Sequence, residues 1–310
     1  MAIKAPKQDM NLIKLVDQFH SEEKSRAFLE QVRWPDGVTC PHCGSKSVSR
    51  INTRNQFECN KLQHQFSVTS GTIFHDSHLP LWKWLLTTYM MIEAKKGVSA
   101  NQIKRTIGVS YKTSWYLCHR IRAAMAEAYP DKLRGTVEVD EAFIGGKSRY
   151  KQKKNWREEG GKKKAMVLGI IERGGNVRLK YEGEEAYKEV LRQFIYRHAR
   201  TDTKRIITDD WPAYKGIGDH DTLHEVIKHK DRQYVVGDVH TNTIESVWSL
   251  LNRSIIGAYH KVSVKHLDAY LDELEWRFNN RRNPYLFRET LRRLLNAEVL
   301  TFQKLTQKRA

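Results

Sequence analysis

A chain of 310 residues, 40% of them hydrophobic, is too long for one small domain and apolar enough for two or three folded modules. Its apolar runs fall short of the roughly 20 residues that a membrane span needs. Residues 1–9 lack the apolar stretch of a signal peptide, so we expect a cytoplasmic protein with no membrane partner. The formal net charge of +18 and the sequence pI of about 9.7 favour nucleic acid as a partner, without choosing between DNA and RNA.

The chain begins with a predicted helical lead-in over residues 1–35. Apolar side chains recur there at helical spacing, and the turn Pro35-Asp36-Gly37 then breaks the pattern.

Residues 36–74 lose the helical spacing and are predicted to form short strands around Cys40, Cys43 and Cys59. Two thiolates separated by two residues suit a tetrahedral Zn²⁺ site. A disulfide framework is unusual in a chain of this length with only four cysteines. We therefore predict a zinc-ribbon-like module here, whereas the distant Cys118 is expected in a buried core.

Residues 75–130 are predicted to be helical and to contain a helix-turn-helix-like pair. Ser99 is a favourable N-cap for a helix over 100–107, and Ser110 for a helix over 111–126. Basic side chains of this pair are candidate contacts to DNA phosphates or base edges. They are Lys104, Arg105, Lys112, Arg120 and Arg122. The alternative is a packing spacer whose solvated faces happen to be basic.

From residue 131 onward the pattern becomes α/β. The predicted elements are, in order, strands at 136–144, 165–172 and 176–182, a helix at 185–198, a strand at 205–208, and helices at 242–255 and 266–279. This is the element order of an RNase H-like core. We expect the core to span residues 131–300, followed by a short tail at 301–310.

A run of basic residues from Lys147 to Lys164 interrupts the α/β pattern. Lys153 and Lys154, near its centre, are candidate contacts to the DNA backbone. A solvated loop is the alternative interpretation of such a charge run.

Two of the predicted strands carry acidic residues. Alternation along 136–144 places Glu138 and Asp140 on one face, and Asp209 ends the strand at 205–208. An unpaired carboxylate near a core is costly, and a bound metal offsets that cost. Phosphoryl transfer on DNA needs such a cluster, since two divalent ions roughly 3.5–4 Å apart activate the attacking oxygen and stabilise the leaving one. The alternative is that each acid is an ordinary strand-end or surface residue.

A third acid comes from the predicted helix over 242–255. Glu245 lies at the edge of its apolar stripe, so it can point across a groove toward the sheet. Asn242, on the same polar side, is the reserve for this position. Arg253 is a candidate phosphate contact or else a solvated helix residue. Glu138 and Glu141 are weaker candidates for a catalytic acid, and we expect structural roles for them.

Three longer stretches carry a resemblance to a known family: 137–146 (VEVDEAFIGG), 208–214 (TDDWPAY) and 240–248 (HTNTIESVW). They resemble bacterial insertion-sequence DDE transposases, most closely the group with an N-terminal zinc ribbon. Further matching stretches extend the resemblance over nearly the whole chain. It implies that Asp140, Asp209 and Glu245 are catalytic and hold two Mg²⁺ or Mn²⁺ ions.

The ribbon departs from that family at one position. The family carries a second Cys-x-x-Cys, but here the stretch reads Cys59-Asn-Lys-Leu62, and leucine cannot bind zinc. Zn²⁺ held by the three cysteines then needs another fourth ligand, for which His64 and His42 are candidates. The third alternative is a decayed site that binds zinc weakly or not at all.

The sequence therefore predicts a DNA transposase that cleaves the ends of an insertion element and joins the 3′ hydroxyls to target DNA by two-metal-ion phosphoryl transfer. The expected partner is double-stranded DNA, at the terminal repeats and the target, which would associate the protein with the nucleoid. By analogy with other transposases we expect a homo-oligomer on DNA. The alternatives are a catalytically inactive, sequence-specific DNA-binding protein or decayed copy, and a related nuclease without strand transfer.

Overall fold

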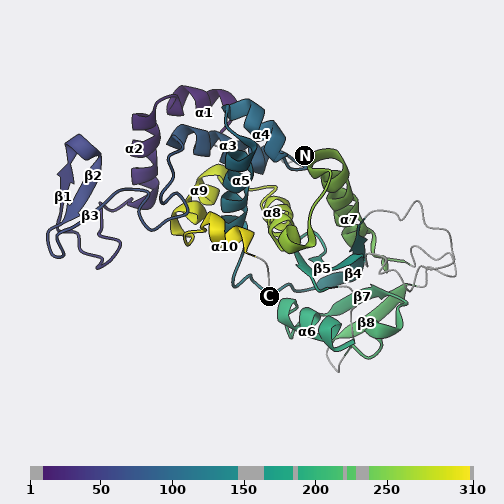
Figure 1. Ribbon diagram of the computed structural model, residues 1–310. Coiled ribbons are helices and arrows are strands. Elements are labelled where there is room, and N and C mark those ends of the chain that lie inside the picture. The colour runs from purple at the N-terminus through teal and green to yellow at the C-terminus, as the bar shows by residue number, and fades with distance from the viewer. Residues whose placement is uncertain (1–9, 146–163, 184–187, 219–221, 228–236, 308–310) are drawn as a thin grey trace, which may run out of the picture. The chain divides into compact units, whose positions relative to one another are not determined.

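The computed structural model describes residues 10–145, 164–183, 188–218, 222–227 and 237–307 (Figure 1). The chain divides into two compact units, one of Met1–Ala126 with Asn280–Ala310 and the other of Glu127–Asn279. The second unit thus ends before residue 300, where the sequence analysis placed its boundary, because the next helix packs on helices of the first unit. Among the residues described, every helix is too short or too polar to cross a membrane.

The first unit includes a small antiparallel sheet in the order β1-β2-β3. Its strands are β1 at Val48–Ile51, β2 at Gln56–Cys59 and β3 at His64–Phe66. Phe57 and Phe66 stack with ring centroids 5.8 Å apart, and Trp34 packs edge-on against both rings. These three aromatic rings give the ribbon-like module an apolar core of its own.

Helices make up the rest of the first unit. They are α1 Leu12–Phe19, α2 Glu22–Arg33, α3 Leu81–Glu93, α4 Ala100–Ile107, α5 Tyr111–Met125, α9 Leu286–Asn296 and α10 Phe302–Thr306. Ser99 and Ser110 cap α4 and α5 as predicted, because each hydroxyl accepts a hydrogen bond from the third following backbone N–H. Gly108 ends α4 with a φ of 62°, which favours glycine, so the predicted helix-turn-helix-like pair is present.

The sequence analysis missed α9, although its apolar residues recur at helical spacing. Leu291, Leu294 and Leu295 are buried where α9 packs against α2, α3 and α5. This packing assigns the C-terminal residues to the first unit.

The second unit contains a five-stranded sheet in the order β6-β5-β4-β7-β8. Its strands are β4 Thr136–Ile144, β5 Ala165–Glu172, β6 Val177–Tyr181, β7 Arg205–Asp209 and β8 Leu223–Ile227. Strands β4, β5 and β6 are antiparallel neighbours, whereas β7 and β8 run parallel to β4. This topology confirms the predicted RNase H-like core. The sequence analysis did not predict β8, whose five residues (LHEVI) alternate weakly between apolar and polar.

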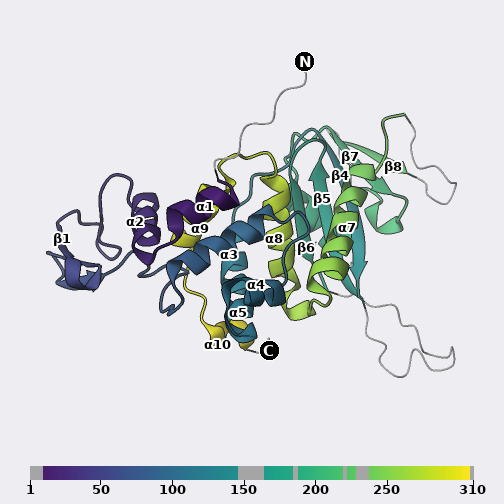
Figure 2. The same ribbon diagram turned by 90° about the horizontal axis from the view of Figure 1, so that it is seen from above.

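Helices cover both faces of this sheet. α6, Lys188–His198, packs on one face, where Val137 and Val139 of β4 join a buried cluster. α7, Asn242–Ser254, and α8, Leu267–Asn279, lie on the other face (Figure 2). A π-helical turn at Ile255–Tyr259 follows α7, and a 3-10 turn at Val264–His266 precedes α8. Glu138 and Asp140 therefore share the opposite face of β4 from Val137 and Val139, as predicted, and this face is the one that α7 covers.

Side chains of α8 also bond the outer edge of β6. Alternate backbone N–H groups of this strand point away from β5 and donate to oxygens of the helix. The pairs are Val177 with Asn279 at 2.8 Å, Leu179 with Glu275 at 2.9 Å and Tyr181 with Asp268 at 3.2 Å.

Candidate active site and zinc ribbon

The parallel pairing of β4 and β7 brings two of the predicted catalytic acids together. Glu138 lies opposite Ile207, so continuing the register by two residues places Asp140 beside Asp209. Carboxylate oxygens of Asp140, Asp209 and Glu141 all lie within 4.8 Å of one another. Glu141 comes from the α6 face of β4, and its carboxylate accepts a hydrogen bond from the Tyr214 hydroxyl at 2.8 Å.

Burial disfavours the ionised forms of two of these carboxylates. It raises the pKa of Asp140 to about 6, and the charges of Asp209 and Glu245 add to the effect. Burial also raises the pKa of Glu141 to about 7, against the hydrogen bond from Tyr214. A divalent cation would offset both penalties. A donor set made of carboxylate oxygens matches the ligands that Mg²⁺ and Mn²⁺ prefer, so these residues fit the metal.

Glu245 lies in the first turn of α7, outside the 4.8 Å cluster. Its exposed carboxylate accepts a hydrogen bond from the Thr241 hydroxyl at 3.1 Å. Its negative charge contributes to raising the pKa of Asp140, so it acts on the same site. Asn242, the reserve, is exposed at the first position of α7. The choice between Glu245 and Asn242 stays a prediction.

A tryptophan that the sequence analysis treated only as an apolar residue holds Asp140. The Trp248 indole N–H donates to Asp140 Oδ2 at 2.8 Å, and this hydrogen bond lowers the carboxyl pKa against the larger effect of burial. The ring has room because Gly169, opposite Asp140 on β5, lacks a Cβ. A Cβ there would lie 2.5 Å from Trp248 Cη2. Glycine inside a strand is the sequence signal for such a close approach.

Two other residues named from the sequence stand apart from the carboxylate cluster. Arg253 is exposed, and its guanidinium donates to the Ser249 carbonyl one turn earlier, at 3.2 Å. Glu138 is fully buried and bonds backbone N–H groups at the start of α7, which agrees with the structural role expected for it.

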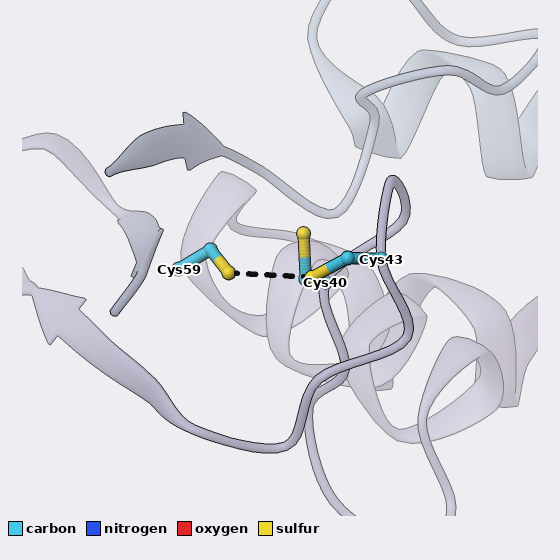
Figure 3. Close-up of side chains that lie close together, drawn as sticks. All are labelled: Cys40, Cys43 and Cys59. Atoms are coloured by element: carbon cyan, nitrogen blue, oxygen red, sulfur yellow. Dashed lines mark hydrogen bonds between the residues drawn. The ribbon is translucent and has the colours of Figure 1, made fainter. Parts of the chain in front are cut away.

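The three ribbon cysteines converge on one point (Figure 3). Their Sγ atoms lie within 4.8 Å of one another, and Cys43 Sγ is 3.6 Å from Cys59 Sγ. Burial alone would raise the pKa of the Cys40 thiol, but hydrogen bonds from the backbone N–H groups of Cys43 and His42 lower it overall. A lowered pKa favours the thiolate, and three clustered sulfur donors fit Zn²⁺.

The two histidines considered as a fourth zinc ligand do not belong to the group of sulfur atoms that lie within 4.8 Å of one another. The rings of His64 and His42 pack against each other with centroids 4.3 Å apart, and neither joins the cysteine group in the described ribbon. Leu62 is 52% exposed. Three cysteine sulfur atoms therefore define the site, and its fourth ligand stays open. Cys118 is buried in the helical unit, as expected.

Comparisons with known proteins give matches to the regions that hold the carboxylates and the cysteines. The ISXO2-like transposase domain matches residues 132–279, and the transposase zinc-ribbon domain matches residues 20–65. A Halobacterium salinarum protein described as an uncharacterized protein in transposable element ISH50 is 30% identical over 284 residues, covering 87% of this chain and 95% of that protein. The chain belongs to the ISXO2-like transposase family. The family resemblance found in the sequence is thereby confirmed.

Two of the basic residues predicted to contact DNA are buried in this transposase instead. Arg120 is 4% exposed and Arg122 is 2% exposed. The Arg120 guanidinium donates to the His75 carbonyl at 2.7 Å and lies over the rings of Trp84 and Tyr116, at 4.9 and 5.2 Å. Because α3, α4 and α9 pack around α5, both positions face inward. The prediction of DNA contacts from these two arginines is corrected accordingly.

The other basic residues of the pair face solvent. Lys104 and Arg105 are exposed on α4, and Lys112 is exposed at the start of α5, with its ammonium 4.5 Å from the centre of the Phe302 ring. These three positions stay the predicted DNA contacts of the transposase. Lys153 and Lys154 lie outside the described residues.

Proposed function

We propose that this transposase cleaves the ends of an insertion element and joins the freed 3′ hydroxyls to target DNA. The observation that supports the proposal best is the carboxylate group where the middle of β4 lies beside the end of β7. Oxygens of Asp140, Asp209 and Glu141 lie within 4.8 Å of one another there. Such a group suits divalent-cation chemistry on phosphates, and the chain is a member of a transposase family.

Asp140, Asp209 and Glu245 are proposed to hold Mg²⁺ or Mn²⁺, with Glu141 as a further oxygen donor. Two divalent ions, when bound, supply charge neutralisation at the attacking and the leaving oxygens of a phosphoryl transfer. The residues of the chain contribute mainly by positioning. Trp248 orients the carboxylate of Asp140 through its indole N–H.

The helices α4 and α5 and the ribbon-like module, all in the first unit, are proposed to recognise the terminal repeats of the element. Lys104, Arg105 and Lys112 would neutralise DNA phosphates, and Arg253 would do the same from the last turn of α7. Zn²⁺ bound by the cysteines would stabilise the ribbon, because metal binding to such a small module adds directly to its folding free energy. DNA binding would associate the protein with the nucleoid. A homo-oligomer would hold two element ends at once.

Strand cleavage and joining on a labelled duplex carrying the terminal repeat, in Mg²⁺, tests the proposal. The wild type is expected to cleave and join. Asp140→Asn and Asp209→Asn are expected to bind the same duplex and do neither. Glu245→Gln and Asn242→Ala, made separately, decide the third residue, because only loss of the true ligand abolishes cleavage.

Wild-type protein that binds the duplex but cleaves it in neither Mg²⁺ nor Mn²⁺ would contradict the proposal. It would favour a catalytically inactive DNA-binding protein. Leu62 is the observation that supports this second candidate, since leucine replaces a sulfur ligand of the family. Zinc content measured by mass spectrometry on the same preparation separates an intact ribbon from a decayed one.

A further inference from the structure

We propose that Glu138 is a positioning residue of the active site. It fixes the start of α7, which carries Glu245, to β4, which carries Asp140. The inference rests on the proposed function, because it takes Glu245 as part of the catalytic group. Glu138 precedes Asp140 by two residues, so both side chains leave β4 on the same face, toward α7.

The carboxylate of Glu138 is 0% exposed and accepts hydrogen bonds from four donors. Oε2 accepts from the backbone N–H groups of Thr243 and Ile244, at 2.8 and 3.0 Å. Oε1 accepts from the Thr243 hydroxyl and from Arg173 Nε, both at 2.8 Å. The N-cap residue Thr241 makes no side-chain cap hydrogen bond. A carboxylate from a neighbouring strand thus takes the place of the usual capping side chain, where the helix dipole favours negative charge.

Arg173 holds this arrangement from the hairpin turn between β5 and β6. Besides bonding Glu138, its guanidinium donates to the backbone carbonyls of Asp238 and His240, at 2.6 and 2.9 Å. One side chain therefore fixes both the carboxylate and the segment that leads into α7. A buried ion pair adds little stability over a well-packed apolar pair. What the pair of Glu138 and Arg173 contributes here is a fixed position for the start of α7.

Helix α7 is tied to β4 on both sides of Glu245. Before Glu245, backbone N–H groups bond Glu138, and after it the Trp248 indole bonds Asp140 at 2.8 Å. Sliding or rotating α7 along β4 breaks one of these ties. Glu138 therefore sets where Glu245 stands relative to Asp140, which is the role of outer residues that orient metal ligands.

Titration of the full-length protein with Mn²⁺, followed by electron paramagnetic resonance without DNA, tests the inference. Glu138→Gln keeps the side-chain volume but presents an NH₂ group to N–H donors, so α7 loses its anchor. The expected result is a Kd for Mn²⁺ that rises about 10- to 100-fold. The Mg²⁺ concentration for half-maximal strand cleavage is expected to rise in parallel.

Glu273→Gln is the matched control. Glu273 is also 0% exposed and paired with an arginine, Arg277, at 3.3 Å, but it lies on α8 and accepts from the Tyr259 hydroxyl. Both variants remove a buried carboxylate from an ion pair, so both are expected to lower the melting temperature. Only Glu138→Gln is expected to change Mn²⁺ binding.

A Glu138→Gln protein that melts earlier but binds Mn²⁺ with the wild-type Kd would overturn the inference and leave the proposed function intact. Wild-type protein that binds no Mn²⁺ would overturn both. If Glu138→Gln does not fold, Arg173→Lys replaces it. A single ammonium group cannot reach the Glu138 carboxylate and both carbonyls at once, so the same rise in Kd is expected, and an unchanged Kd overturns the inference.

Discussion

Replacing Gly169 with alanine measures how tightly α7 packs on the sheet beside Asp140. A Cβ on residue 169 would lie 2.5 and 2.6 Å from two ring carbons of Trp248, and 3.0 Å from Cδ1 of Ile244. Carbon atoms normally approach to about 3.5–4.0 Å, so the indole or the strand must move by about 1 Å. Overpacking of this kind costs about 1–3 kcal/mol of unfolding free energy. At roughly 2–4 °C per kcal/mol for a unit of this size, the melting temperature falls by about 2–12 °C.

Scanning calorimetry of Gly169→Ala beside Gly257→Ala checks this magnitude. An added Cβ on Gly257 meets nothing within 4 Å, so alanine there is expected to be neutral or slightly stabilising. Displacing Trp248 also weakens its hydrogen bond to Asp140, so Gly169→Ala is expected to cleave the labelled duplex more slowly at temperatures where both variants are folded. Equal melting temperatures and equal cleavage rates for the two variants would refute the reasoning.

Asp272→Asn is expected to raise the melting temperature at pH 8 but not at pH 4. Burial raises the pKa of Asp272 from its ordinary value of 3.8 to about 7. The stability that the protonated carboxyl contributes is therefore complete below pH 3.8 and is lost as the pH rises through 7. An equal change in melting temperature at pH 4 and pH 8 would contradict this. Cys59→Ser is expected to leave less than one zinc per chain by mass spectrometry, and an unchanged zinc content would exclude the sulfur cluster as the site. Lys112→Ala is expected to weaken DNA binding in fluorescence anisotropy and to lower the slope of log K against log salt by about 1. Arg120→Ala, which removes a buried side chain, is expected instead to lower the melting temperature, and a stable variant with a reduced salt slope would restore Arg120 as a DNA contact.

The parts of the fold that the sequence predicts well depend on residues close together in the chain. Ser99 and Ser110 each cap a helix through a backbone N–H three residues away. Alternation of apolar and acidic residues over 137–140 assigns the faces of β4 before any partner strand is known. In both cases the physical cause is complete within one turn of helix or one short strand.

The parts that it misses depend on contacts between distant segments. Arg120 and Arg122 look like surface residues by type, but three packed helices turn them inward. The hydrogen bond from Thr243 to Glu138 joins residues 105 positions apart, and no local sequence pattern predicts it. Strand β8 is recognisable chiefly because it pairs with β7.

The same distinction between local signals and distant contacts applies to the candidate site. Asp140 and Asp209 could be predicted, because alternation along β4 and the end of β7 single them out and parallel pairing brings the two strands together. That Glu141 joins them could not, since this depends on how its side chain meets Tyr214. The choice between Glu245 and Asn242 depends on how α7 is rotated about its axis, which its apolar stripe fixes only loosely.

The bonds from α8 to β6 bear on how copies of this protein behave when they are crowded. An uncovered strand edge is a template on which a second chain can add a strand, and such edges drive aggregation. On β6 the outward N–H groups are already bonded to Asp268, Glu275 and Asn279, so a foreign strand can pair there only after α8 has detached. Molecules gathered at high local concentration are thereby kept from merging through this edge into a shared β-sheet.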